Sequence, residues 1–215
     1  MDTVEEMAEL VTLWPLIQNV QLGNQEDVIR WRWTADGCYT AKSAYEIQFQ
    51  GSYSTINCKM LWKAKVEGKH RFFTWLLVQN KILTADKLQV RNWPCNPICP
   101  LCDQMEETAQ HLCLHCSFAQ EVWFLVHSWT DGLVPIPTDG CSLEHWWNSS
   151  IRAAAKENKR RLASLMMYTA WNIWKERNRR VFEQVTASPT RILVLIKEEV
   201  HIRRMACGGG PPEEH

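Results

Sequence analysis

Apolar residues recur at helical spacing along most of this chain. Residues 117–129 place Phe118, Val122, Leu125 and Trp129 on one stripe, which predicts an amphipathic helix. Residues 69–79 are apolar on nearly every side, so we expect this helix to be central and buried. Further helices are predicted over residues 41–49, 59–66, 84–90, 106–114, 143–155, 159–183 and 190–205. The predicted core positions of the long helix are Leu162, Leu165, Met166, Tyr168, Thr169, Ile173 and Trp174.

A β-hairpin is predicted just before the helix at 41–49. Residues 28–33 are rich in β-branched and aromatic side chains, Asp36-Gly37 is a strong turn signal, and residues 38–40 return as the second strand. Thr40 is then placed to cap the following helix. The sequence therefore predicts a mainly α fold with a short N-terminal β-hairpin, a helical lobe and a C-terminal helical lobe.

Turn-forming residues suggest where these parts meet. Residues 130–141 contain two glycines and two prolines, so we expect a loop here that separates two lobes. The predicted organisation is an acidic N-terminal arm, a central domain, a helical C-terminal region and a disordered tail. These parts cover residues 1–27, 28–129, 142–206 and 207–215, respectively.

The strongest chemical signal is a set of metal-binding residue types in the central domain. Cys99, Cys102, His111 and Cys116 follow the spacing C-x2-C-x8-H-x4-C, which is typical of a structural zinc site. Three sulfurs and one nitrogen complete a tetrahedron, so no position is left for a water to be activated. We therefore expect one structural zinc ion that holds shape and performs no chemistry.

Neighbouring residues leave the ligand set open. Cys95, Cys113 and His115 lie close enough in sequence to replace a predicted ligand. Prolines alternate with the first cysteines, so that half-site belongs to a turn and not to a helix. The odd count of nine cysteines and the lack of an apolar N-terminal signal segment argue against disulfides, which predicts an intracellular, reducing compartment.

Composition bears on membrane association and on how charge is distributed along the chain. No apolar run approaches the roughly 20 residues of a membrane-spanning helix, so no membrane partner is expected. Most of the 12 tryptophans are predicted to be packing anchors. Net charge is zero, but residues 59–91 and 156–180 each hold eight basic and two acidic residues, whereas residues 103–144 hold seven acids and no Lys or Arg. Such blocks either pair with one another or attract phosphate.

Several short runs along the chain form one set of motifs. They are Trp33, DGCYTAKSAY at 36–45, LWK at 61–63, KHRFF at 69–73, WL at 75–76, CPLC at 99–102, ET at 107–108, HL at 111–112, Cys116 and Trp123. Together they resemble a known family, the zinc-binding domain that follows reverse transcriptase in plant non-LTR (LINE-type) retrotransposons. The run WNIWKERNRRVF at 171–182 resembles the helix that trails this domain. The resemblance covers about residues 28–129 and implies that the four motif residues bind zinc and that the partner is nucleic acid.

Two functional hypotheses follow. The first is a nucleic-acid-binding module for RNA or DNA, in which exposed aromatic residues stack on unpaired bases. Its candidate phosphate contacts are Lys63, Lys65, Lys69, His70, Arg71, Lys81, Lys175, Arg177, Arg179 and Arg180. The second is a zinc-stabilised protein-interaction module, in which the acidic arm and the Trp-rich helices meet another protein. A retroelement remnant without selected function is the remaining alternative.

Catalysis is not expected. The sequence has no Asp-Asp pair for a reverse transcriptase palm. RNase H chemistry needs several acids that converge on one site, and we expect no room for such a domain in this sequence. It also has no Gly-rich phosphate loop, no G-x-S-x-G elbow and no His-Glu-x-x-His helix.

Overall fold

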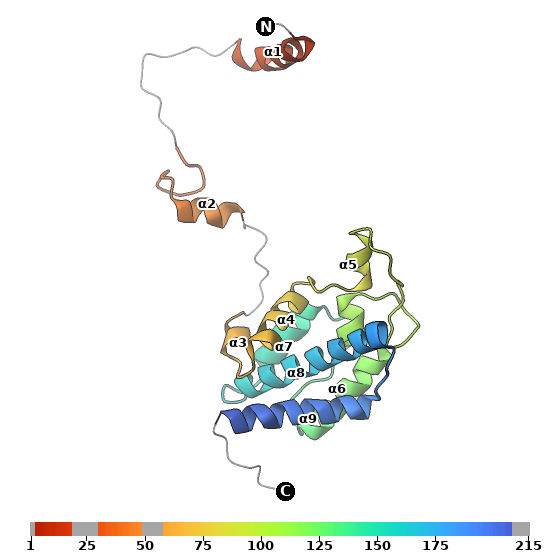
Figure 1. Cartoon of the computed structure of the whole chain (residues 1–215). Helices are drawn as coiled ribbons and strands as arrows, with labels where there is room; N and C mark the ends of the chain where they lie inside the picture. The colour runs from red at the N-terminus through yellow and green to blue at the C-terminus, as the bar shows by residue number, and fades with distance from the viewer. Residues whose placement is uncertain (1–2, 19–29, 49–57, 208–215) are drawn as a thin grey trace. The chain divides into compact units, whose positions relative to one another are not determined.

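The computed structural model describes residues 3–18, 30–48 and 58–207, and it divides the chain into two compact units (Figure 1). Unit 1 covers residues 1–52 and unit 2 covers residues 53–215. The described residues are mainly helical, as predicted, and their only β pairing is an isolated bridge between Ile98 and Glu106. No described helix is both long enough and apolar enough to span a bilayer.

Unit 1 contains two helices, α1 (Val4–Ile17) and α2 (Ala41–Gln48). The predicted cap of α2 is confirmed, because the Ser43 N–H donates to Thr40 Oγ1 at 3.0 Å and the Thr40 N–H donates to Ser43 Oγ at 3.1 Å. This reciprocal pair satisfies donors that the first helical turn would leave open. Helix α1 lies in the predicted acidic arm, for which the sequence pattern gave no secondary structure.

The predicted N-terminal β-hairpin is not supported. Residues 30–40 form turns and irregular backbone, while residues 28 and 29 lie outside the described residues. The Asp36-Gly37 turn is present: Gly37 has a φ of 69°, and the Trp31 N–H donates to the Gly37 carbonyl at 2.8 Å. A two-stranded hairpin needs a packed face to persist, and Trp33 and Tyr39 are instead 47% and 65% exposed.

Unit 2 is a helical bundle built around one long central helix. Its elements are α3 (Cys58–Lys63), α4 (Gly68–Val78), α5 (Ala85–Gln89), η1 (His111–His115, a π-helical turn), α6 (Ser117–Trp129), α7 (Leu143–Ala153), α8 (Lys159–Asn178), η2 (Arg179–Glu183, also π-helical) and α9 (Pro189–Ala206). Helix α8 packs against α3, α4, α6, α7 and α9, so it is the scaffold of the unit (Figure 1).

The core confirms most of the predicted pattern on α8. Every predicted core residue of this helix is buried except Trp174, which is half-buried. The loop 130–141 is present, but both sides of it share one core. Val134 within the loop is fully buried, and Trp123 before it packs edge-on against Trp146 after it, with ring centroids 5.0 Å apart. The two predicted lobes therefore pack as one body.

Two burial predictions need correction. Helix α4 buries Phe73, Leu77 and Val78 but leaves Phe72 55% exposed, so it is an amphipathic surface helix and not a fully enclosed one. The buried residues of α6 are Phe118, Ala119, Val122, Trp123 and Val126. Phe118 and Val122 were predicted, but Leu125 and Trp129 are not among the buried residues. In both cases the neighbours of the helix, which sequence periodicity does not specify, determined the buried face.

A half-buried carboxylate joins α9 to α8. Glu199 accepts hydrogen bonds from Asn172 Nδ2 at 2.9 Å and from Lys175 Nζ at 2.7 Å, and His70 Nε2 lies 3.7 Å from it. Burial alone would raise the pKa of Glu199, but its interactions with His70, Lys175 and Asn172 lower it from 4.5 to about 2. The charged form of Glu199 is thus stabilised by folding.

This lowered pKa predicts a specific acid sensitivity. Glu199 contributes stability above its ordinary pKa, and that contribution is lost as the pH falls from 4.5 towards 2. We expect Glu199→Gln to flatten the fall in unfolding free energy over this interval, measured by urea denaturation at a series of pH values. Zinc binding also weakens in acid, so the matched control is Glu198→Gln, which removes an exposed neighbouring carboxylate. Equal pH slopes for the two variants would contradict the assignment.

Candidate metal centre

The first half of the centre is a tight loop at residues 98–106. The Cys99 N–H donates to the Met105 carbonyl at 2.8 Å, and the Asp103 N–H donates to the Cys99 carbonyl at 2.9 Å. Asp103 has a φ of 55°, which lets the chain reverse directly after Cys102. The loop is closed by the bridge between Ile98 and Glu106. The predicted non-helical turn around the first two cysteines is confirmed.

The second half departs from the predicted helix over residues 106–114. Helical structure starts only at residue 109, because Glu106 is held in the bridge to Ile98. It then widens into η1, where the Cys116 N–H donates to the His111 carbonyl at 2.7 Å. In an α-helix, residues five apart lie about 140° apart around the axis. The i→i+5 turn brings His111 and Cys116 towards one side, where they can share a ligand.

The two halves bring the four predicted ligand atoms together. Cys99 Sγ and Cys116 Sγ are 3.9 Å apart, Cys102 Sγ and His111 Nε2 are 3.3 Å apart, and all four ligand atoms lie within 4.8 Å of one another. Zinc–sulfur bonds of about 2.3 Å in a tetrahedron place two sulfurs about 3.8 Å apart. A disulfide would require about 2.05 Å. The arrangement therefore fits a zinc ion and not a disulfide.

Burial and protonation support the same reading. Cys99 and Cys116 are fully buried. The Cys99 thiol donates to Cys116 Sγ, and this hydrogen bond, together with burial, raises the pKa of Cys99 to about 12. The same hydrogen bond lowers the pKa of Cys116. A zinc ion bound to both thiolates would take the place of the proton in this hydrogen bond.

The three competing residues lie outside the cluster. Cys95 Sγ is 3.6 Å from the Ala85 carbonyl oxygen, and Cys113 is fully buried with a pKa raised by that burial. The Cys113 carbonyl accepts a hydrogen bond from Trp123 Nε1 at 2.7 Å, which fixes η1 against α6. Across the described residues, the group that could hold an ion is the predicted quartet, without Cys95, Cys113 or His115.

An arginine from η2, which continues directly from α8, anchors the first half-site. Arg180 Nη1 donates to the carbonyls of Pro100 and Leu101, both at 3.1 Å, and its guanidinium lies 4.6 Å from the centroid of the Phe118 ring. Arg180 Nε also donates to the fully buried Glu176 at 2.9 Å. The backbone between Cys99 and Cys102 is therefore fixed to α8 and η2 by one side chain.

A buried ion pair fixes the loop between the two half-sites. Arg177 Nε and Nη2 donate to the two carboxylate oxygens of Glu107 at 2.6 and 2.8 Å. Glu107 is 1% exposed and Arg177 is 5% exposed. Glu107 also accepts from the Ala85 N–H at 3.2 Å, so α5, the metal loop and α8 meet at this carboxylate. We call Arg177, Arg180, Glu107 and Glu176 the arginine clamp.

The clamp corrects part of the predicted nucleic-acid surface. Arg177 is buried against Glu107, both Arg179 and Arg180 are paired with Glu176, and Lys175 is paired with Glu199. His70 is 1% exposed and lies 3.0 Å from Glu67, so it cannot reach a phosphate either. These basic residues fix the fold. Of these pairs, Arg177–Glu107 joins the acidic block at 103–144 to the basic block at 156–180. Glu176 lies inside the basic block and Glu199 after it, so those pairs could not be read from the charge pattern.

The remaining predicted contacts lie on the surface. Lys63, Lys65, Lys69 and Lys81 are exposed. Arg71 is half-buried, and its Nη2 donates to the Val66 carbonyl at 2.8 Å. Within the described residues, none of these five side chains forms an ion pair with a carboxylate.

The fold and site define a helical, zinc-binding domain with a closed Cys3His ligand set, and comparisons with known proteins agree. Residues 39–123, which include all four ligands, match the family described as zinc-binding in reverse transcriptase. This confirms the predicted resemblance over that segment and supports descent from a retrotransposon. The domain's metal is zinc.

A curated relative points the same way. A protein of Arabidopsis thaliana named "Putative ribonuclease H protein" is 26% identical over 106 residues, which cover 46% of this chain and 17% of that protein. The match thus spans less than a fifth of the relative. No solved structure matches this chain significantly.

Proposed function

We propose that this chain is a non-catalytic, zinc-stabilised module that binds RNA or DNA. The observation that carries the proposal is the surface of α3 and α4, where exposed lysines without ion pairs in the described residues lie beside exposed aromatic rings. Lys63 and Lys65 follow Trp62, which is 50% exposed, and Lys69 precedes the exposed Phe72. Cations that follow a phosphate backbone and rings that stack on bases are the two features of single-strand binding.

The aromatic part of this surface is ordered. Phe72 and Trp75 stack with centroids 5.8 Å apart and an interplanar angle of 26°, and Lys81 Nζ lies 5.8 Å from the Trp75 centroid. A half-exposed stack with a neighbouring cation presents a flat face on which an unpaired base can rest. This favours single strands over duplexes.

The non-catalytic part of the proposal rests on the ligand set. Three thiolates and one imidazole fill a tetrahedral zinc ion, so its role is to hold the metal loop against α6 and α8. A whole retroelement protein would supply any polymerase or nuclease activity from other domains.

Binding is tested by fluorescence anisotropy with labelled 20-nucleotide RNA, single-stranded DNA and duplex DNA. If four phosphates are contacted, the affinity for a single strand should fall about 50-fold between 50 and 200 mM salt. Binding that is undetectable or insensitive to salt would contradict the proposal.

Removal of residues 1–27 separates this function from a protein-interaction module. This segment holds six acids and no Lys or Arg, so its loss should raise affinity for nucleic acid by removing a competing polyanion. One observation favours the alternative: α1 carries Leu10, Leu13, Trp14 and Ile17 at the spacing of a helix that docks in a groove. In that case the truncated chain would lose a protein partner while its affinity for nucleic acid stayed unchanged.

A further inference from the structure

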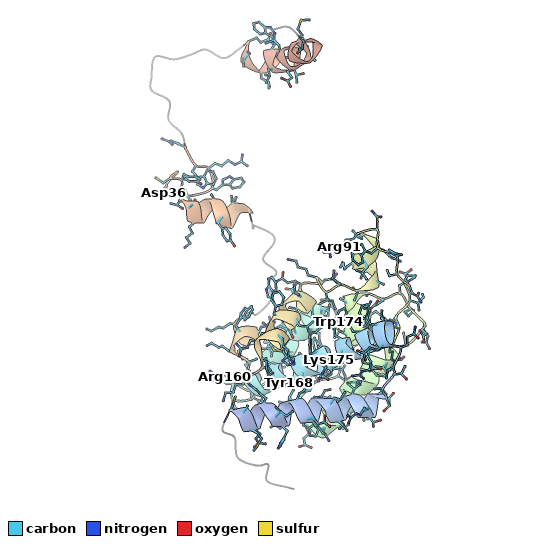
Figure 2. All side chains as sticks on the ribbon, viewed as in Figure 1. Asp36, Arg91, Arg160, Tyr168, Trp174 and Lys175 are labelled. Atoms are coloured by element: carbon cyan, nitrogen blue, oxygen red, sulfur yellow. The ribbon has the colours of Figure 1, made fainter. Side chains whose placement is uncertain are left out.

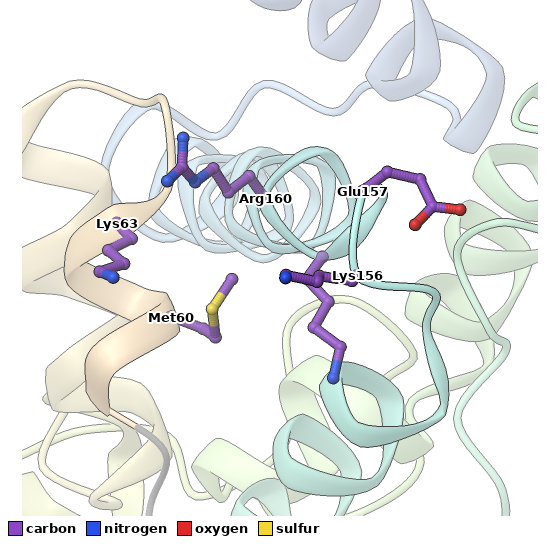
Figure 3. Close-up of a pocket in the computed structure, with 6 residues that line it drawn as sticks. Met60, Lys63, Lys156, Glu157 and Arg160 are labelled. Carbon is purple, nitrogen blue, oxygen red and sulfur yellow. The ribbon is translucent and has the colours of Figure 1, made fainter.

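A pocket lies between α3 and the first turn of α8, and its lining is strongly basic. The residues around it are Met60, Lys63, Lys156, Glu157, Lys159 and Arg160, and its volume is about 500 Å³ (Figure 3). This volume is within the range of about 300–1,000 Å³ for small-molecule sites. Only Lys63 of these residues belongs to the contacts predicted from sequence.

The fold holds the two walls of the pocket in place. The Lys65 N–H at the end of α3 donates to Ser164 Oγ on α8 at 3.2 Å. Leu61 on α3 and Leu162 on α8 are both buried in the common core. The walls come from segments almost 100 residues apart, and the packing of α3 on α8 places Lys63 and Arg160 at one pocket.

The charges in the pocket are not balanced. Glu157 is the one acid of the lining, and its carboxylate points away from Lys63 and Arg160 (Figure 3). No ion pair links any of the four cations to a carboxylate within the described part of the chain. The positive potential of the pocket is therefore available to an anion.

The start of α8 breaks a local rule of helix formation. Helix N-termini carry a partial positive charge and favour acids, yet the first turn of α8 has none and begins Lys159-Arg160-Arg161. The Asn158 side chain also makes no capping hydrogen bond. Such a start costs helix stability unless an anion sits near it. Departures from local rules are expected at functional or strained positions.

We infer that this pocket is where the proposed nucleic-acid partner places its phosphate groups, an inference that rests on the proposed function. Lys63 belongs to both the pocket and the lysine-rich surface of α3 and α4, so the two form one continuous basic surface. A phosphodiester strand supplies evenly spaced anions along such a surface, which a single small anion does not.

The test compares two arginine substitutions with equal charge change. Arg160→Glu alters the pocket, and Arg91→Glu alters an exposed arginine at the other end of the unit (Figure 2). In the anisotropy assay we expect Arg160→Glu to weaken single-strand binding about tenfold and to reduce the salt slope by about 0.7, the value of one phosphate. Arg91→Glu should change affinity less than twofold.

A folding defect is separable from loss of a contact. Glutamate in the first turn of a helix is stabilising, so Arg160→Glu should keep or raise the melting temperature while it weakens binding. If the wild-type chain binds and the two variants lose affinity equally, the pocket is not the phosphate site, but the proposed function is unaffected. Failure of the wild-type chain to bind any of the three probes would overturn both.

A further arm separates a strand from a small phosphate compound. Inorganic pyrophosphate is titrated against the wild-type chain, and the melting temperature is followed. Pyrophosphate could stabilise the wild-type chain but not Arg160→Glu, while both chains bind single strands equally well. That result would contradict a strand as the occupant of the pocket.

Discussion

Cys102→Ser should abolish zinc binding and lower the melting temperature of the purified protein by about 8–16 °C. The physical basis is linkage: a ligand present at 1,000 times its dissociation constant stabilises the folded state by about 4 kcal/mol. In a domain of this size each kcal/mol is worth about 2–4 °C. Partial loss of structure is expected, because the core of α4, α7 and α8 includes many residues that do not depend on the metal. Zinc content by mass spectrometry and thermal melts by circular dichroism measure both effects.

The matched control is Cys95→Ser. Cys95 is half-buried and lies in the same proline-rich segment, but its sulfur is outside the ligand cluster. This variant should keep one zinc per chain and melt within about 2 °C of wild type, the range of a substitution at a partly exposed site. A chelator should lower the melting temperature of wild type and Cys95→Ser by a similar amount and have no effect on Cys102→Ser. Full zinc occupancy in Cys102→Ser would contradict the ligand assignment.

The metal ligands were predictable from sequence because their chemistry is local. Cysteine and histidine are few, and the spacing from Cys99 to Cys102 and from His111 to Cys116 limits how each pair can approach one ion. The spacing alone did not exclude Cys95, Cys113 or His115. The choice among them depends on the π-helical turn at η1, which has no signature that short-range propensities capture.

The longer helices of unit 2, α4 and α6 to α9, were also predictable, since their apolar periodicity extends over several turns. The hairpin was wrong for a related reason: the turn at Gly37 is encoded locally, whereas strand pairing needs a surface to pack on. Long-range pairing was the least accessible feature. Glu107 and Arg177 are 70 residues apart, and only the fold shows that one neutralises the other.

Arg177→Met should cost about 3–5 kcal/mol of unfolding free energy, because it leaves the Glu107 carboxylate buried without its partner. The guanidinium makes two hydrogen bonds to Glu107 and lies 5.2 Å from the centroid of the Trp174 ring, so its loss removes several contacts at once. Urea denaturation measures the cost. The control is Arg191→Met, which breaks an exposed pair with Glu198 and should cost less than about 1 kcal/mol. If the two variants are equally stable, the clamp is not a stabilising feature.

The double variant Arg177→Met, Glu107→Met separates charge from packing. Replacing a buried ion pair by apolar residues of similar volume is often neutral or stabilising, so the double variant should recover most of the loss seen in Arg177→Met. Because Glu107 lies between Cys102 and His111 in the chain, the clamp also limits how far the metal loop can open. Arg177→Met should therefore release zinc to a chelator faster than wild type, and the double variant should return the rate towards wild type. If neither variant changes the rate of zinc release, the clamp and the metal stabilise the fold independently.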